Sequence, residues 1–157
     1  MRNCRLAVAA ALVAILLLPS VAVATIVPQR GMAGVRIGMT QEQVRGVLGE
    51  PRRVVRNQNE FGPYTEFRYP YRVIVAFQGD AAVTAVATTG RRERTSRGIG
   101  VGSTEAEVRA RVRGVRCETF AAIRSCTVGS LAPGKRVTDF LLRNGRVVRV
   151  TVGIVID

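Results

Sequence analysis

The feature that most constrains this chain is a match between its two halves. Residues 38–45 (GMTQEQVR) align with residues 102–109 (GSTEAEVR) at an offset of 64 (102 minus 38), and glycine, threonine, valine and arginine coincide. Residues 77–83 (FQGDAAV) align with residues 142–148 (LRNGRVV) at an offset of 65 (142 minus 77). Two matches at nearly the same offset predict a duplication, so both halves should fold in the same way.

Each half opens with a helix-start signal. Thr40 is followed by Gln43, and Thr104 is followed by Glu107, at the spacing of a capping box. In this motif the threonine hydroxyl accepts from an unpaired helix amide, and the longer side chain accepts from the amide of the threonine. We expect two helices of about ten residues, which are too short to be stable unless an apolar face packs against other elements.

Four strand-like segments follow each predicted helix. They combine β-branched residues with alternating polarity, and Asn144–Gly145 is a strong two-residue hairpin signal. The segments lie near residues 52–56, 65–69, 72–78 and 82–88 in the first half, and near 115–119, 123–128, 136–143 and 146–156 in the second. The sequence therefore predicts an α+β fold of two tandem repeats, each a short helical segment packed on a four-stranded antiparallel sheet.

The N-terminus has the pattern of a secretory signal peptide. A positive head at residues 1–5 precedes an uncharged apolar run over residues 6–24 that ends in Ala22-Val23-Ala24. We expect cleavage after Ala24 and a secreted or extracytoplasmic location in the cell envelope. An uncleaved segment would instead be a membrane anchor. The domain boundaries predicted for the rest are an N-terminal extension (25–33), repeat 1 (34–89), a basic linker (90–98) and repeat 2 (99–157).

Cys117 and Cys126 are the two cysteines that remain after such a cleavage. In an exported chain, a closely spaced pair on consecutive predicted strands indicates a disulfide. A redox or metal-binding role is less well supported, because the spacing is that of neither a thioredoxin-type motif nor half of a zinc site.

The residue inventory argues against an enzyme. The chain has no histidine, which is the commonest general base and metal ligand. Glu105 and Glu107 stand at a predicted helix start, where a carboxylate complements the helix dipole, so they do not indicate a catalytic pair. We expect no catalytic residue, no metal, no cofactor and no small-molecule substrate.

The charge is strongly positive, with 24 lysines and arginines against 11 acids. In a cytosolic protein this excess of positive charge would suggest binding to nucleic acid. An exported protein does not encounter nucleic acid in the cytosol, so we expect no nucleic-acid partner. Attraction to an anionic envelope surface remains open, as does a simply solvated basic surface. Residues 91–97 form the one evident basic patch, within the predicted linker.

Aromatic residues crowd into residues 61–71 and are interleaved with arginines. Tyrosine and arginine dominate binding hot spots, and a buried tyrosine hydroxyl needs a partner. The alternative is that part of this row is core beneath the helix, an interpretation we prefer for Phe67 and Phe77. The candidate binding residues are Tyr64, Tyr69, Tyr71, Arg68 and Arg72.

Residues 38–51 (GMTQEQVRGVLGEP) resemble the opening motif of two related groups of proteins. These are the small lipoprotein subunit of the outer-membrane β-barrel assembly machine and the secreted β-lactamase inhibitor protein, which is a tandem repeat of the same unit. The resemblance implies a helical segment on an antiparallel sheet and a role in protein binding. The chain differs from the lipoprotein subunit because it is predicted to be duplicated and to lack a lipid anchor. The inhibitor's contact residues have no identifiable counterparts here.

The expected function is therefore an exported, non-enzymatic module that binds an unidentified protein through its sheet face. One alternative is a cationic domain that adheres to anionic envelope lipid or wall polymer. The other is a structural component of the envelope.

Overall fold

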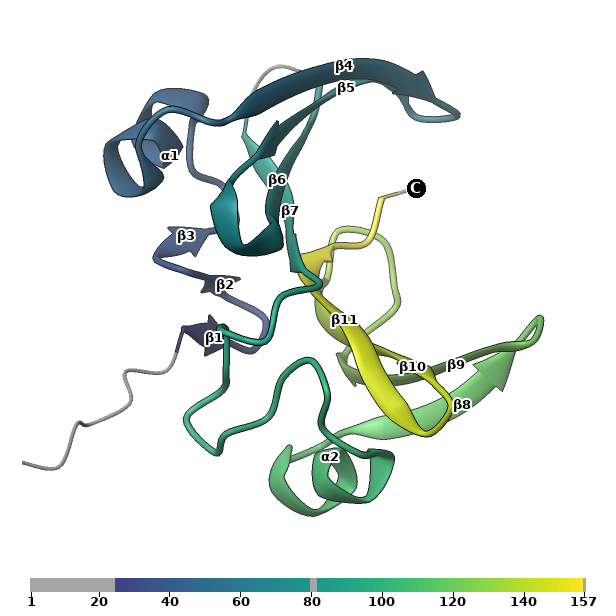
Figure 1. The fold of residues 1–157 in the computed structure, drawn as a ribbon. Helices are drawn as coiled ribbons and strands as arrows, with labels where there is room; N and C mark the ends of the chain where they lie inside the picture. The colour runs from purple at the N-terminus through teal and green to yellow at the C-terminus, as the bar shows by residue number, and fades with distance from the viewer. Residues whose placement is uncertain (1–24, 80–81, 157) are drawn as a thin grey trace, which may run out of the picture.

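The computed structural model describes residues 25–79 and 82–156 (Figure 1). The predicted signal peptide, residues 1–24, lies outside the described residues. In the part that the structure describes, neither helix is long and apolar enough to cross a membrane. The elements in chain order are β1 (Ile26–Val27), β2 (Gly31–Met32), β3 (Val35–Arg36), α1 (Gln41–Leu48), β4 (Arg53–Asn59), β5 (Gly62–Arg68), the 3-10 turn η1 (Pro70–Arg72), β6 (Val73–Gln78), β7 (Val83–Thr88), α2 (Glu105–Arg111), β8 (Arg116–Phe120), β9 (Ile123–Gly129), β10 (Arg136–Arg143) and β11 (Arg146–Ile154).

One eight-stranded antiparallel sheet dominates the molecule. Its strand order is β4-β5-β6-β7-β11-β10-β9-β8, so β4 and β8 form the two edges. At its centre β7 pairs with β11, which places Val86 opposite Val152 and Thr88 opposite Val150. The short strands β1, β2 and β3 form a separate three-stranded sheet.

The predicted α+β fold of two repeats, each with its own four-stranded sheet, is wrong. The chain is mostly strand, and its two helices have 8 and 7 residues. All eight long strands belong to one sheet, and residues 25–36 add a second sheet that was not predicted. The reason is that β7 and β11 would each present a row of unpaired backbone groups as the edge of a separate sheet. Their mutual pairing satisfies those groups.

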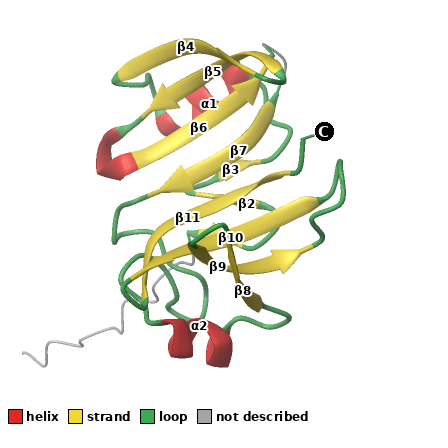
Figure 2. Cartoon of the chain, turned by 90° about the vertical axis from the view of Figure 1, so that its right-hand side faces the viewer, coloured by secondary structure: helices red, strands yellow, loops and turns green. Residues whose placement is uncertain are grey.

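One face of the large sheet forms the core. A row of mutually paired, buried residues crosses six strands on this face, and a second such row runs beside it. Val44 of α1, Val108 of α2 and Met32 of β2 are almost fully buried against this cluster. Figures 1 and 2 show both helices and the small sheet on this side. The residues of the first row are Phe67, Val75, Val86, Val152, Thr138 and Val128.

Both helices begin in complete capping boxes. The Thr40 hydroxyl accepts from the Gln43 amide at 3.2 Å, and Gln43 Oε1 accepts from the Thr40 amide at 2.9 Å. The corresponding distances for Thr104 and Glu107 are 3.2 and 2.8 Å. Because such short helices have little stability of their own, these caps matter for placing the buried valines on the sheet.

We expect Thr104→Ala to lower the free energy of unfolding by about 1 kcal/mol, the usual effect of losing a helix N-cap. Urea unfolding followed by circular dichroism would measure this change. Thr104→Ser keeps the accepting oxygen and serves as the matched control. Equal stability of the alanine variant and the native chain would contradict the prediction.

Candidate binding face

The second face of the eight-stranded sheet, which we term the open face, is not covered. Glu66, Ala76 and Ala85 lie side by side in its ladder and are only partly buried, whereas Phe67 and Val75 on the core face are fully buried. The sheet curves so that its two ends project toward the same side, which makes the open face concave (Figure 1). Figure 2 looks onto this face.

The hairpin of β8 and β9 forms one rim of the open face. Phe120 and Ile123 flank its turn and are 84% and 57% exposed. The turn residues Ala121 and Ala122 have φ of 44° and 66°, a left-handed conformation that alanine disfavours. Strained backbone of this kind is concentrated at functional sites. The hairpin therefore holds two exposed apolar side chains in an unfavourable turn.

A shallow hollow of about 350 Å³ lies on the open face beside this hairpin. Its floor is polar, and the exposed Phe120 and Leu131 stand on its walls. Exposed apolar side chains that gather beside polar groups mark many surfaces that contact another macromolecule. The lining residues are Arg116, Glu118, Phe120, Ser125, Thr127, Gly129, Ser130 and Leu131.

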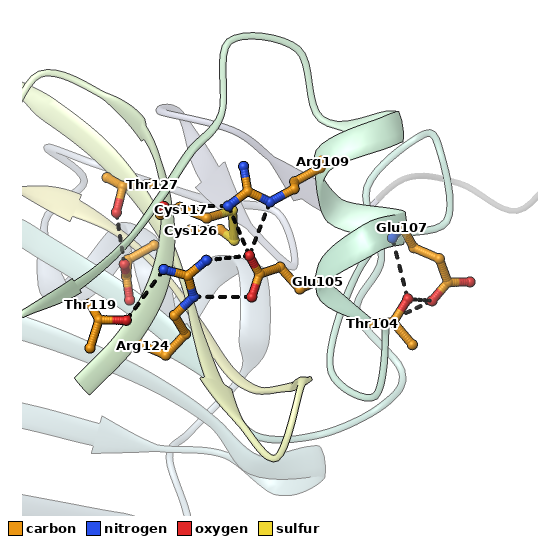
Figure 3. The surroundings of a disulfide bond; sticks show 10 residues. Thr104, Glu105, Glu107, Arg109, Cys117, Thr119, Arg124, Cys126 and Thr127 are labelled. Atoms are coloured by element: carbon orange, nitrogen blue, oxygen red, sulfur yellow. Dashed lines mark hydrogen bonds and ion pairs between the residues drawn. A yellow bond between two sulfur atoms is a disulfide. The ribbon is translucent and has the colours of Figure 1, made fainter. Parts of the chain in front are cut away.

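A disulfide joins the two strands of the rim hairpin on the core side (Figure 3). Cys117 and Cys126 are direct cross-strand partners and are bonded to each other, which confirms the predicted pairing. Closing so short a loop contributes about 2 to 3 kcal/mol in the chain-entropy model. The hairpin is therefore held in one arrangement before any partner arrives.

Glu105 ties the same hairpin to helix α2. Its carboxylate accepts from Arg109 of α2 at 2.9 Å and from Nε of Arg124 on β9 at 3.1 Å (Figure 3). Arg124 also donates to the Thr119 hydroxyl on β8. The hydrogen bonds from Arg124 and Arg109 lower the pKa of Glu105 from 4.5 to about 2. The carboxylate is therefore charged over the physiological range.

One group of potential metal ligands occurs among the described residues. It consists of Glu105, Cys117 and Cys126, whose ligand atoms lie within 4.8 Å of one another. Because the two sulfurs are bonded to each other, neither is a thiolate, the form in which cysteine binds metal. With the disulfide formed, this group therefore offers a metal only the carboxylate of Glu105, which is already paired with Arg109 and Arg124.

Asp139 of β10 is an acid on the floor of the open face. It lies opposite Thr127, whose hydroxyl donates to it at 3.0 Å. Burial raises the pKa of Asp139, and the hydrogen bonds from Thr127 and Ser125 oppose this shift. The floor thus contains a partly desolvated carboxyl group.

The tyrosines and arginines predicted to bind do not form one patch. Tyr64 and Arg68 lie on β5, on the open face, at the end far from the β8–β9 rim. Tyr71 and Arg72 lie in the turn η1 with φ of 61° and 64°, and Tyr71 is 65% exposed with Arg92 stacked 4.4 Å from its ring.

Tyr69 is 7% exposed and belongs to the core cluster, beside Phe67. Its hydroxyl has no hydrogen-bond partner among the described residues, and desolvation raises its pKa. The sequence reasoning missed Phe120, Ile123 and Leu131. The signal was present in the first two, since they lie where the predicted strands 115–119 and 123–128 meet.

No model of a known protein family matches this sequence, and no curated protein matches it. Several solved structures resemble it in fold. An extracellular protein containing an SCP domain from Bacillus anthracis has a TM-score of 0.52 at 11% identity, over 75% of this chain and 44% of that one. A DUF4309 family protein from Bacillus subtilis has a TM-score of 0.50 at 16% identity, over 86% of this chain and 90% of that one. A cysteine-rich secretory protein from Staphylococcus aureus has a TM-score of 0.46 at 14% identity, over 75% of this chain and 44% of that one.

These likenesses concern the fold alone, which is rich in β-strand. The chain spans less than half the length of the Bacillus anthracis protein. Neither the SCP-domain protein nor the DUF4309 protein is a β-lactamase inhibitor protein or a subunit of the outer-membrane assembly machine. The superfamily suggested by residues 38–51 is therefore not supported.

We expect Glu105→Gln to destabilise the protein at pH 7 and to lose this effect in acid. The pKa of Glu105 is lower in the folded chain, at about 2, than its ordinary value of 4.5. The contribution of Glu105 to stability is therefore fully present above pH 4.5 and is lost as the pH falls through about 2. Denaturant unfolding across this range would measure the difference between the variant and the native chain. Glu118→Gln, on strand β8 of the hairpin that Glu105 contacts, is the matched control. A difference in the free energy of unfolding between the variant and the native chain that does not become smaller below pH 4 would contradict the role of Glu105 in stabilising the fold.

We expect Asp139→Asn to stabilise the protein at pH 7. Burial raises the pKa of Asp139 above its ordinary value of 3.8. The contribution of Asp139 to the stability of the folded state is therefore fully present below pH 3.8 and is lost as the pH rises through the pKa of the folded state. Asparagine still accepts from Thr127 but carries no charge. Thermal unfolding at pH 3 and pH 7 would show the stabilisation only at the higher pH, and Glu60→Gln is the control. A destabilised variant at pH 7 would show that the charge itself is needed.

Proposed function

We propose that this chain is an exported, non-enzymatic protein-binding module whose partner occupies the open face of the eight-stranded sheet. One observation carries the proposal: the central strands of the sheet are covered on one face, whereas the other face is uncovered and concave. Large exposed apolar side chains, Phe120, Ile123 and Leu131, stand where this face ends at β8 and β9. Aromatic anchors beside a polar hollow are the usual core of a protein interface.

The rigidity of the rim also supports the proposal. The Cys117–Cys126 bond and the Glu105 ion pairs fix the β8–β9 hairpin from the core side. A surface ordered in advance loses less conformational entropy on binding, so more of the contact energy appears as affinity. This arrangement favours recognition by a preformed surface over folding on contact.

The compartment and the residue types agree with this function. The pattern of residues 1–24 predicts a secretory leader, and disulfides persist in oxidising compartments. The chain has no histidine, the commonest general base, and Asp139 accepts hydrogen bonds from the hydroxyls of Thr127 and Ser125 on the open face. Binding without chemistry is what such a surface can offer.

Adhesion to an anionic envelope surface is a second candidate, favoured by the arrangement of arginines. Among residues 25–79 and 82–156, the ion pairs involve Arg45, Arg68, Arg109 and Arg124, and the other arginines have no acidic partner. A surface with so many unpaired cations attracts anionic polymers through its general field.

The first test is affinity capture from envelope and culture-supernatant extracts, washed at low and then high salt. We compare the native chain with a Phe120→Ala, Leu131→Ala double variant and with Tyr71→Ala, which removes an exposed aromatic ring away from the β8–β9 rim. A discrete protein should survive high salt on the native chain. Loss of one anchor typically costs more than 1 kcal/mol, so we expect the double variant to bind that protein at least about tenfold more weakly.

Purified partner titrated against the three proteins then gives the dissociation constants. Retention only of lipid or wall material, released by salt and equal for all three proteins, would contradict protein binding and favour the cationic surface. Screening accounts for that difference, because salt weakens exposed charge interactions and leaves apolar contacts in place.

A further inference from the structure

A second site lies in the segment between β7 and α2, on the side of the sheet that carries α2 (Figure 1). Arg94 is at its centre. Its guanidinium donates to the Val101 carbonyl at 3.1 Å, to the Ser103 hydroxyl at 3.3 Å and to the Arg91 carbonyl at 3.2 Å. The positive charge of Arg94 is thus fixed in place by neutral groups alone.

Two more arginines approach the same stretch of backbone. Arg146, the first residue of β11, donates to the Gly102 carbonyl at 3.1 Å. Nε of Arg91 lies 3.7 Å from the position that a Cβ atom on Gly102 would occupy. Three guanidinium groups therefore surround residues 101–103.

The charge of this cluster is only partly balanced, since three arginines face one acid. In the part of the chain that the structure describes, none of the three arginines forms an ion pair. Glu107 is the one acid on the wall. Its Oε2 accepts from the amide and hydroxyl of Thr104 at 2.8 and 3.0 Å, and its carboxylate also interacts electrostatically with Arg146. Neighbouring like charges repel each other, so an anion placed between them is favoured.

Ser103 supplies a neutral donor at the same place. It is 6% exposed and lines the cavity. Its oxygen accepts from Arg94 and from the Gly100 amide, which occupies both lone pairs. Among the described residues no hydrogen bond uses its hydroxyl hydrogen, which is therefore left to donate to a ligand.

We propose that this cavity binds a phosphate group through Arg91, Arg94, Arg146 and the Ser103 hydroxyl. The cavity has a volume of about 350 Å³, which admits a phosphate together with part of a molecule that carries it. The planar donors of a guanidinium can pair with two phosphate oxygens at once, which is open to Arg91. Arg94 already donates to Arg91, Gly98, Val101 and Ser103, so it contributes one remaining N–H and its charge. The inference does not depend on the proposed function, because the open face contributes none of these side chains.

Titration calorimetry with inorganic phosphate, at constant ionic strength, tests the site. The key variant is Arg91→Gln, since the Arg91 side chain makes no hydrogen bond or ion pair that its loss would break in the described structure. Arg149→Gln is the matched control: it removes the same charge from an exposed position on β11. We expect Arg91→Gln to weaken phosphate binding about tenfold or more and Arg149→Gln to change it less than twofold.

Arg146→Gln provides a second variant with the same expected loss, and circular dichroism verifies that each variant is folded. Vesicles of phosphatidylcholine with and without phosphatidylglycerol distinguish the sources of the phosphate. Binding of the anionic vesicles that depends on Arg91 and is displaced by free phosphate indicates a headgroup or wall-polymer ligand, whereas binding of free phosphate alone indicates a soluble one. No measurable phosphate binding, or equal weakening by Arg91→Gln and Arg149→Gln, would overturn the site.

Discussion

The pairing of β7 with β11 is the interaction on which the rest of the structure depends. It joins the strands before and after the 89–104 segment into one sheet, with Val86 against Val152 and Thr88 against Val150 in register. Because side chains alternate across a strand, this register puts the buried residues of all the central strands on the same face. A one-residue slip would turn one half of the sheet over and divide the core.

A continuous sheet of this width leaves one face open. In the part of the chain that the structure describes, two short helices and a small three-stranded sheet are available to cover it, and all of them lie on the core side. The two ends of the open face then differ. At the β4 edge, polar residues such as Arg56 and Asn57 discourage pairing with another strand, whereas at the β8 edge the disulfide fixes a hairpin that exposes Phe120. The open face is therefore asymmetric, and its apolar anchors lie at one end.

Local features were predictable from the sequence and long-range ones were not. The capping residues Thr40 and Thr104 act within four residues, and the cysteine pair acts across one hairpin, so short patterns sufficed for them. The pairing of β7 with β11 joins residues more than sixty positions apart. The alternation of polar and apolar residues along either strand does not indicate which strand it pairs with. The prediction that Tyr69 and Tyr71 share one binding surface also failed because of a change in chain direction. Pro70 turns the chain, so Tyr69 points to the core while Tyr71 is exposed. Parity along a strand holds only while the strand continues.

The distribution of charge separates the two proposed sites physically. The acids Glu66, Glu118 and Asp139 all lie on the open face, so the arginines there are partly balanced, and Glu66 pairs with Arg68 at 2.8 Å. Among the described residues the cluster of Arg91, Arg94 and Arg146 forms no ion pair, and Glu107 is the one acid that lines its cavity. A long-range field from a net charge of +13 draws anions toward the whole molecule, but only converging donors can hold one in a fixed geometry. Ionic strength acts on the field and on an exposed anion contact, while apolar burial on the open face is almost independent of it. One fold can therefore present two surfaces that respond differently to the same surroundings.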